Sequence, residues 1–187
     1  SSGLIGKTVI RHLKDHKVRT AGRDEFGMTN KAFIGKYEES DVILNFTGSP
    51  VLRRWTKRNR RKIIDSRIDT TRKLGLIVKE GIIKKRHYIS ASAIGIYSEE
   101  GIHSESSPHK GSGFLKEGVE KWETETMKLS GEHTIVSLLR IGIVLSREGG
   151  MLMKMMPVFR MGAGGSIGDG QQAFSWIHIE DLAEATV

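Results

Sequence analysis

Blocks of apolar residues with two different spacings alternate along the chain, and each spacing predicts a different element. Ile5, Val9, Ile10 and Leu13 recur at the intervals of a helix face, whereas Val42–Leu44 is a continuous apolar run typical of a buried strand. Helices are expected over about residues 4–15, 56–79, 114–129 and 151–161, and strands over about residues 18–21, 42–46, 88–91 and 134–141. Strands separated by helices form parallel sheets, so the pattern predicts an α/β fold: a doubly wound parallel sheet of the Rossmann type, with helices on both faces.

The first helix begins in a glycine-containing segment that is suited to a phosphate. Ser2, Gly3, Leu4, Ile5 and Gly6 run directly into the helical pattern, with the two glycines three residues apart. Glycine lets the backbone approach a phosphate closely, and the free amides of a first helical turn point toward the anion. We therefore expect the pyrophosphate of a nucleotide at this segment.

The spacing of the glycines in this segment fits two kinds of phosphate-binding loop and also a simple tight turn. Gly3 and Gly6 match the last two glycines of the dinucleotide loop G-x-x-G-x-x-G, which opens a Rossmann unit. The end of the P-loop of NTPases is matched by Gly6-Lys7-Thr8, but the first glycine of that loop falls on Ser1. A P-loop site also needs an Asp after an apolar strand, and Asn45 stands there instead. The dinucleotide loop is favoured, and the P-loop stays open as an alternative.

The residues that follow the predicted strand at 18–21 bear on the choice of cofactor. A carboxylate at this place binds the ribose 2′-hydroxyl of NAD, and an arginine meets the 2′-phosphate of NADP. Arg23 is better placed than Asp24, so NADP is expected and NAD is the less favoured alternative. A solvated surface arginine is the plain alternative.

Both ends of the pattern are incomplete for a Rossmann fold, in which the first strand lies in the middle of the sheet. No apolar strand precedes the first helix, and a last helical segment starts near His178 and stops without a cap. We expect residues 1–187 to form a single NAD(P)-binding Rossmann domain that lacks its first strand and its C-terminal substrate region. Residues 146–176 would begin that region.

The composition of the chain limits the classes of partner that it is expected to bind. The 187 residues contain no cysteine, which excludes disulfides and thiolate chemistry, and no apolar run is long enough for a membrane span. The formal charge is +8, and seven of the ten residues from Arg53 to Lys62 are basic, a run typical of a solvated helix face. Only 6% of residues are aromatic, which argues against a platform for stacking RNA bases. We expect a cytoplasmic protein that binds a small molecule rather than nucleic acid or membrane, with a homodimer as an open alternative.

Ten short segments together carry a family resemblance. They are Gly3–Gly6, Asn45–Gly48, Arg54–Thr56, Ser66-Arg67, Thr70-Thr71, Ser90–Tyr97, Lys121–Glu123, Leu139–Leu145, Gly162–Gly165 and Ser175–His178. In these segments the chain resembles the atypical extended branch of the short-chain dehydrogenase/reductase superfamily. Within that branch it is similar to the NAD(P)-dependent epimerase-like family that is often labelled sugar nucleotide epimerase, and sometimes cell division inhibitor.

The resemblance implies roles for particular residues. The segment Gly3–Gly6 would hold the pyrophosphate and Arg23 the 2′-phosphate. The adenosine side would be lined by Phe46, Thr47 and Gly48, and the nicotinamide ribose would lie near Ser90, Ala91 and Ser92. A substrate pocket could be walled by Trp55 and Trp176, although core packing explains these tryptophans equally well.

One departure from the superfamily pattern concerns the catalytic residues. The usual reaction needs a Tyr that exchanges a proton and a Lys four residues later that stabilises the phenolate. Tyr37, Tyr88 and Tyr97 are followed at that spacing by Asp41, Ser92 and Gly101, so the chain has no such pair. At the aligned positions Phe114 replaces the Tyr and Gly118 replaces the Lys.

Ser92 and Tyr97 remain as candidate catalytic residues. The plain alternative for Tyr97 is a phenol that packs under its loop with its hydroxyl bonded to the backbone. His178 and Asp181 are expected to cap and orient a helix rather than bind a metal, and no metal site is expected.

Two functions stay open at this point. One is an NADP-dependent oxidoreductase or epimerase acting on a sugar-like or small hydroxylated substrate. The other is a non-catalytic NADP-binding sensor or partner-binding module, and whether the chain is an enzyme depends on which holds.

Overall fold

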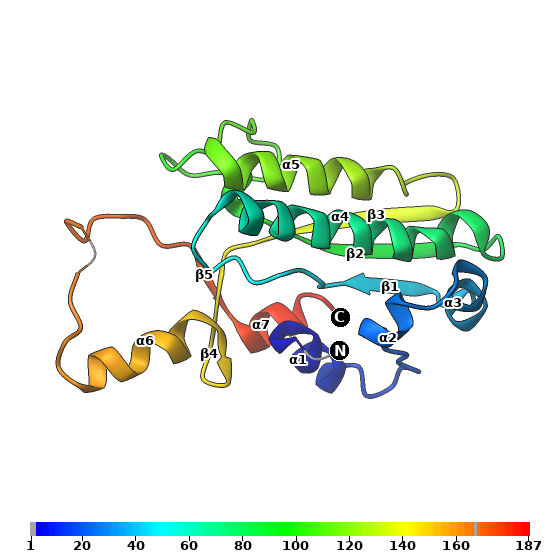
Figure 1. The fold of residues 1–187 in the computed structure, drawn as a ribbon, viewed down its shortest axis with the longest axis horizontal. Helices are drawn as coiled ribbons and strands as arrows, with labels where there is room; N and C mark the ends of the chain where they lie inside the picture. The colour runs from blue at the N-terminus through cyan, green and yellow to red at the C-terminus, as the bar shows by residue number, and fades with distance from the viewer. Residues whose placement is uncertain (1–2, 167) are drawn as a thin grey trace. The chain divides into compact units, whose positions relative to one another are not determined.

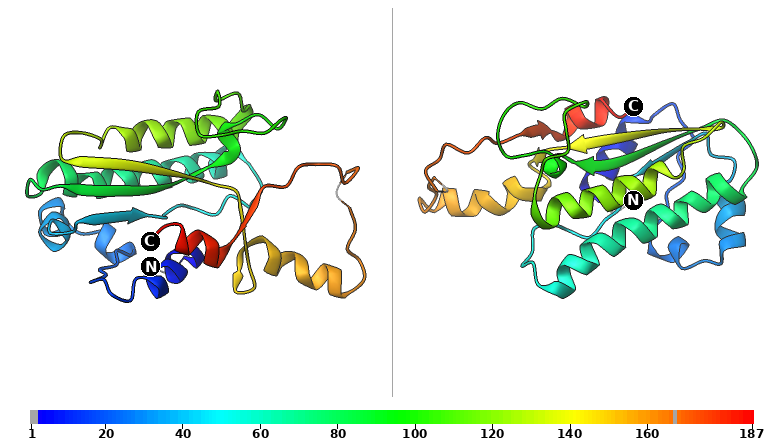
Figure 2. Two further views of the ribbon diagram at one scale, coloured as in Figure 1. Left: turned by 180° about the vertical axis from the view of Figure 1, so that it is seen from behind. Right: turned by 90° about the horizontal axis from the view of Figure 1, so that it is seen from above.

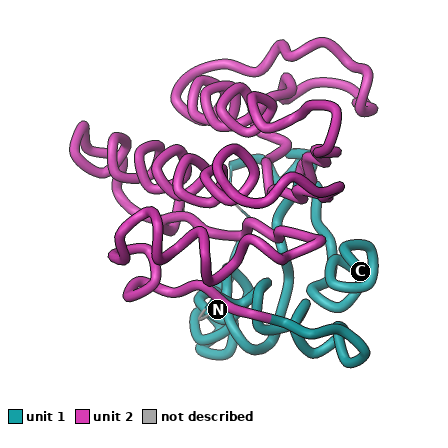
Figure 3. Tube along the Cα trace, turned by 90° about the vertical axis from the view of Figure 1, so that its right-hand side faces the viewer, with its two compact units in different colours: residues 1–18, 141–187 teal, residues 19–140 magenta. Residues whose placement is uncertain are grey.

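The computed structural model describes residues 3–166 and 168–187. The chain forms two compact units, which Figure 3 shows in two colours. The first unit combines residues 1–18 with residues 141–187, and the second comprises residues 19–140. Each unit is described by itself.

The second unit is built on a three-stranded sheet. Its strands are β1 (Val42–Asn45), β2 (Arg86–Ala93) and β3 (Thr134–Ile141), in the order β1-β2-β3. β1 and β2 are parallel, with Val42 opposite His87 and Asn45 opposite Ser90. This register brings the carboxyl end of β1 beside the middle of β2, so Asn45 and Ser90 lie next to each other.

Two long helices, α4 (Lys57–Glu80) and α5 (Gly113–Met127), pack against each other along one face of this sheet (Figures 1 and 2). α4 begins at Thr56, whose hydroxyl accepts a hydrogen bond from the amide of Asn59 at 3.2 Å. The buried core lies between α4, the sheet and α3 (Asn30–Tyr37), with one residue from the segment that follows α5. Its members are Phe33, Tyr37, Ile43, Leu74, Ile77, Tyr88 and Leu129.

The prediction of a strand at residues 18–21 is wrong. A strand needs a partner for its backbone hydrogen bonds, and among the described residues none pairs with this segment. α3 holds the segment instead: the Tyr37 hydroxyl donates to the Thr20 carbonyl at 2.9 Å, and Arg19 donates to the Lys36 carbonyl at 2.6 Å. A short helix, α2 (Arg23–Phe26), follows directly.

The first unit contains the phosphate-loop helix of the sequence prediction, α1 (Leu4–His12), which packs against α7 (Ile179–Glu184). It also contains a parallel pair of short strands, β4 (Ile143–Ser146) and β5 (Trp176–His178), and the helix α6 (Gly150–Arg160). In the described part of the chain no helix is long and apolar enough to cross a membrane.

The alternation of helices with parallel strands confirms the predicted α/β class. The expected helices at 56–79, 114–129 and 151–161 agree with α4, α5 and α6 within two residues at each end, and β3 has the bounds that the pattern predicted. A 3₁₀ turn, η1 (Ile94–Ile96), ends β2 and leads into the loop that carries Tyr97.

Candidate functional site

The first turn of α1 is open to an anion. Gly3 is the N-cap and has no side chain to bond the free amides of Leu4, Ile5 and Gly6, and the turn holds no acidic residue. A Cβ placed on Gly3 would meet no atom of the described residues beyond its chain neighbours within 4 Å, so the space at this position is open. The residues present are therefore compatible with a phosphate group, and the phosphate site at this turn stays a prediction. The candidate residue Ser2 lies outside the described residues.

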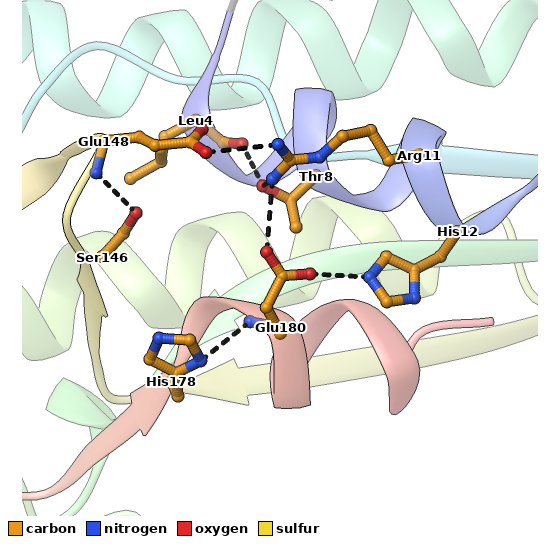
Figure 4. Close-up of polar contacts among 8 residues, drawn as sticks. All are labelled: Leu4, Thr8, Arg11, His12, Ser146, Glu148, His178 and Glu180. Carbon is orange, nitrogen blue, oxygen red and sulfur yellow. Dashed lines mark hydrogen bonds and ion pairs between the residues drawn. The ribbon is translucent and has the colours of Figure 1, made fainter.

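Ion pairs hold the far end of α1 (Figure 4). Arg11 lies between two carboxylates, Glu148 at 3.2 Å and Glu180 at 3.3 Å, and His12 is 2.8 Å from the second oxygen of Glu180. The hydrogen bond from His12, followed by the charge of Arg11, lowers the pKa of Glu180 against the opposing effect of burial. All of these side chains are partly or largely exposed, so each bridge adds little to stability and mainly orients the helix.

His178 caps a helix, which confirms its expected role. It is the N-cap of α7, and its Nδ1 accepts a hydrogen bond from the amide of Glu180 at 3.4 Å (Figure 4). Over residues 3–166 and 168–187, no group of three or more His, Asp or Glu side chains is arranged to hold a metal ion.

The segment after β1 is fixed by the buried side chain of Asn45. The Asn45 amide nitrogen donates to the hydroxyls of Thr71 and Tyr88, and its oxygen accepts from the amide and hydroxyl of Thr47. Phe46 is half-buried and Gly48 is exposed. The expected adenosine-side residues Phe46, Thr47 and Gly48 thus form an ordered turn at a strand carboxyl end, where ligands bind in open α/β sheets.

Arg67 supports this turn from α4. Its guanidinium packs against Gly48, so that a Cβ there would lie 2.8 Å from Cζ, and it donates to the Ser49 carbonyl at 3.1 Å. It also lies over the ring of Trp122, with 5.2 Å from Cζ to the ring centroid. Burial lowers the pKa of Arg67. The sequence reasoning gave Arg67 no role, although it lies in one of the segments that carry the resemblance.

The candidate residues at the end of β2 point to different partners. Ser90 is fully buried and its hydroxyl donates to the Ala91 carbonyl at 3.0 Å. Ser92 is also buried, but its hydroxyl donates to Oε1 of Glu123 on α5 at 2.5 Å. The Ser92 hydroxyl is therefore oriented by a carboxylate that the sequence reasoning did not single out.

Glu123 belongs to a network that ends on Tyr97. Arg140 on β3 donates to both oxygens of Glu123, each at 2.9 Å, and its Nη1 donates to the Tyr97 hydroxyl at 2.6 Å. Burial raises the pKa of Glu123, but the hydrogen bonds from Arg140 and Ser92 outweigh it and leave that pKa below its usual value. The hydrogen bonds that Arg140 donates to Glu123 are the largest cause that raises the pKa of Arg140. The network joins the two candidate catalytic residues through one buried ion pair.

The plain alternative for Tyr97 was a hydroxyl bonded to the backbone. In the described structure the Tyr97 hydroxyl instead accepts a hydrogen bond from the Arg140 side chain. The ring stacks on His103, with centroids 5.1 Å apart, and meets His109 edge-on at 6.2 Å. An open hollow of about 660 Å³ next to this cluster is lined by Ile96, His109, Glu120, Glu123, Thr124, Met127 and Lys128.

The replaced catalytic positions lie at the start of α5. Phe114 packs edge-on against Trp55, with centroids 5.4 Å apart, and the Arg60 guanidinium lies over its face. Gly118 faces Ile64 on α4.

The candidate substrate residues Trp55 and Trp176 are both exposed and lie in different units. Arg23, at the start of α2, is exposed, and its side chain forms no hydrogen bond or ion pair with another described residue.

Curated relatives cover nearly the whole chain. It is 34% identical to the chloroplastic epimerase family protein SDR39U1 homolog of Arabidopsis thaliana and 37% identical to epimerase family protein SDR39U1 of Mus musculus, over 97% of the chain in both cases. The chain belongs to this epimerase family. It spans 58% and 65% of the length of these two relatives. No protein-family model matches the chain.

Solved structures of the epimerase family share the fold. The human SDR39U1 protein, crystallised with NADPH, gives a TM-score of 0.83 at 29% identity and covers 97% of this chain and 65% of its own. The nucleoside-diphosphate sugar epimerase from Corynebacterium glutamicum gives 0.75 at 29% identity, over 98% of this chain and 41% of its own. These matches confirm the Rossmann fold and the assignment to the short-chain dehydrogenase/reductase superfamily.

Proposed function

We propose that this epimerase-family chain binds NADP and acts as an oxidoreductase or epimerase on a sugar-like or small hydroxylated substrate. The observation that carries the cofactor assignment is the uncapped, acid-free first turn of α1. The human relative crystallised with NADPH, which supports NADP over NAD. Arg23 supports the same choice, because its exposed guanidinium suits a phosphate and is not bonded to another described residue.

In this proposal the chain's own residues bind and orient. The amides of Leu4, Ile5 and Gly6 hold the pyrophosphate, and Arg23 holds the 2′-phosphate. Ser92 and Tyr97 act on the substrate oxygen: Ser92 positions it, and Tyr97 gives or takes the proton. The bound cofactor supplies or accepts a hydride, and an epimerase would pass through a keto form of the substrate. The similarity to the Corynebacterium glutamicum nucleoside-diphosphate sugar epimerase supports the sugar-like substrate class.

A non-catalytic NADP-binding sensor is the second candidate, and the missing Tyr-x-x-x-Lys pair favours it. A P-loop NTPase is less well supported. The side chain at the end of β1 that would have to bind Mg²⁺ is Asn45, whose polar atoms are already bonded to Thr47, Thr71 and Tyr88.

Two measurements on the purified protein separate these functions. Fluorescence titrations compare NADPH, NADH and ATP. Absorbance at the NADPH band follows net reduction of a panel of sugar-like and small carbonyl compounds, and NMR follows epimerisation of sugar-like compounds, which leaves that absorbance unchanged. The proposal predicts tight NADPH binding and turnover of at least one compound. NADPH binding with no turnover favours the sensor, and ATP binding without NADPH binding contradicts the proposal.

A further inference from the structure

The least exposed ion pair in the described part of the chain has no role in the sequence prediction. The Glu123 and Arg140 side chains are 9% and 18% exposed, whereas the other ion pairs between described residues are more open. A buried pair of this kind gains little stability over apolar residues of the same size. Its partners are the two candidate catalytic residues, Ser92 and Tyr97.

The pair fixes the direction of the Ser92 hydroxyl. An ionised carboxylate can only accept hydrogen bonds, so the Ser92 proton lies toward Glu123 at an oxygen–oxygen distance of 2.5 Å. The lone pairs of the Ser92 oxygen are then left to accept a hydrogen bond. Ser92 is therefore set to accept a hydrogen bond from the hydroxyl of the alcohol form of the substrate, which is the product of carbonyl reduction, whereas the carbonyl form is left to the Tyr97 proton.

The same pair fixes the opposite direction at Tyr97. A guanidinium has donors and no acceptor, so the Tyr97 oxygen accepts from Arg140 at 2.6 Å. Among the described residues nothing accepts the Tyr97 proton, which stays available to a ligand. The cation against the oxygen also stabilises the phenolate that forms when this proton leaves.

We infer that Glu123 and Arg140 are positioning residues that replace the missing lysine: Arg140 stabilises the Tyr97 phenolate, and Glu123 holds both Arg140 and the Ser92 hydroxyl. This inference rests on the proposed function. In carbonyl reduction the carbonyl carbon takes the hydride that NADPH supplies. The C=O π pair moves to oxygen, and that oxygen takes the Tyr97 proton. The phenolate left beside Arg140 regains a proton from water.

The test compares Arg140→Gln, Arg140→Lys, Tyr97→Phe and the double variant Arg140→Gln/Tyr97→Phe. Arg72→Gln is the matched control, because Arg72 pairs with Glu125 on the same helix α5 but is largely exposed. Turnover is measured on the carbonyl compound that the wild type reduces best, across pH. NADPH affinity and the melting temperature are measured for every variant.

The inference predicts that Arg140→Gln and Tyr97→Phe each lower kcat by roughly 10²-fold, the scale of acid catalysis, while NADPH affinity stays within about twofold. Because both act on one proton, the double variant should be no slower than Tyr97→Phe alone. Arg140→Lys should recover part of kcat by restoring the cation, and Arg72→Gln should match the wild type. A purely structural role for Arg140 would instead slow the Tyr97→Phe background further.

A readout independent of turnover uses the ¹⁵N-arginine spectrum of the protein. Arg140 should give resolved guanidinium signals, because four hydrogen bonds to Glu123, Tyr97 and the Glu105 carbonyl restrict its rotation. Tyr97→Phe should shift them. Absence of these signals in the wild type contradicts the inference even if Arg140→Gln fails to fold.

These measurements distinguish a failure of this inference from a failure of the proposed function. Wild-type turnover with unchanged kcat in Arg140→Gln overturns only the roles of Glu123 and Arg140. NADPH binding without any wild-type turnover overturns the proposed enzyme and this inference with it.

Discussion

Each tyrosine of the chain has a different use for its hydroxyl. Tyr37 donates to the Thr20 carbonyl and ties the segment before α2 to α3. Tyr88 is fully buried, its oxygen accepts from Asn45, and burial raises its pKa. Tyr97 is half-buried and bonded to a side chain that can only donate. Only Tyr97 is thus placed to exchange a proton with a ligand.

At the same scale, Glu123 should make the free energy of unfolding depend on pH in the acidic range. Its folded pKa lies below the usual value, so its contribution is present at neutral pH and is lost as pH falls through the folded pKa. We expect Glu123→Gln to lower the free energy of unfolding by about 2–4 kcal/mol at pH 7, because Arg140 is left without its carboxylate. Urea unfolding of both proteins should show this difference shrinking as pH falls below the ordinary range of a glutamate carboxyl and through the lowered pKa of Glu123. The control is Glu117→Gln on the same helix, which is exposed. An equal difference at all pH values would refute the assignment.

Arg23 should separate the two cofactors. If its guanidinium meets the 2′-phosphate, Arg23→Ala should weaken NADPH binding by roughly 10- to 100-fold, the range of a charge-assisted hydrogen bond. NADH has no 2′-phosphate, so its affinity should not change. Parallel fluorescence titrations check this, with Lys31→Ala, an exposed basic residue on α3, as the control. An equal loss for both cofactors would point to a structural role for Arg23.

At the scale of elements, the first turn of α1 offers a sharper test of phosphate binding. Gly3 has an ordinary backbone conformation and open space around it, so Gly3→Val should fold normally. The new side chain would nevertheless stand where the pyrophosphate approaches, and NADPH affinity should fall by about tenfold or more. Gly131→Val, another open and exposed glycine, is the matched control. Unchanged NADPH binding in Gly3→Val would remove the phosphate from this turn.

The loop after η1 depends on a close backbone contact. A Cβ on Gly111 would lie 2.7–2.8 Å from the carbonyl oxygens of Gly95, Ile96 and Tyr97, and the Gly111 amide donates to the Ile96 carbonyl at 2.9 Å. Gly111→Ala must move this backbone, so we expect a loss of about 1–3 kcal/mol in the free energy of unfolding. Turnover should fall as well, because Tyr97 moves with its carbonyl. Gly131→Ala serves as the control in thermal unfolding, and an unchanged melting temperature would show that the loop yields freely.

Local patterns predicted the longer elements and failed where tertiary contacts decide. The helix spacing in α4 and the apolar run in β3 are properties of the segments themselves, so both were found. The segment 18–21 has strand-like residues but no partner among the described residues, and its backbone bonds to α3. β4 and β5 were missed because four and three residues are too few for a pattern to show.

The candidate site shows the same difference between features that local patterns predict and features that tertiary contacts decide. Ser92 and Tyr97 were found because they lie in one continuous segment and carry familiar chemistry. Glu123 and Arg140 were not, because their contacts join residues 17 to 43 positions apart. No spacing rule connects β2, α5 and β3 before the sheet forms. Both residues do lie within segments that carry the family resemblance, which was the available signal.

At the scale of the whole molecule, the expected cofactor residues are divided between the two units. The pyrophosphate turn lies in the first unit, and Arg23, Phe46–Gly48 and Ser92 lie in the second. The chain also spans 58–65% of the two curated relatives. The proposed activity therefore concerns the whole protein, and its binding tests are best made on the full-length chain.

A crystal structure of the full-length protein with NADPH would show directly whether the first turn of α1 binds the cofactor. We expect the pyrophosphate on the amides of Leu4, Ile5 and Gly6, and the 2′-phosphate within hydrogen-bonding distance of the Arg23 guanidinium. A structure in which NADPH binds elsewhere, or in which protein side chains fill the space above Gly3, would rule out this mode of binding.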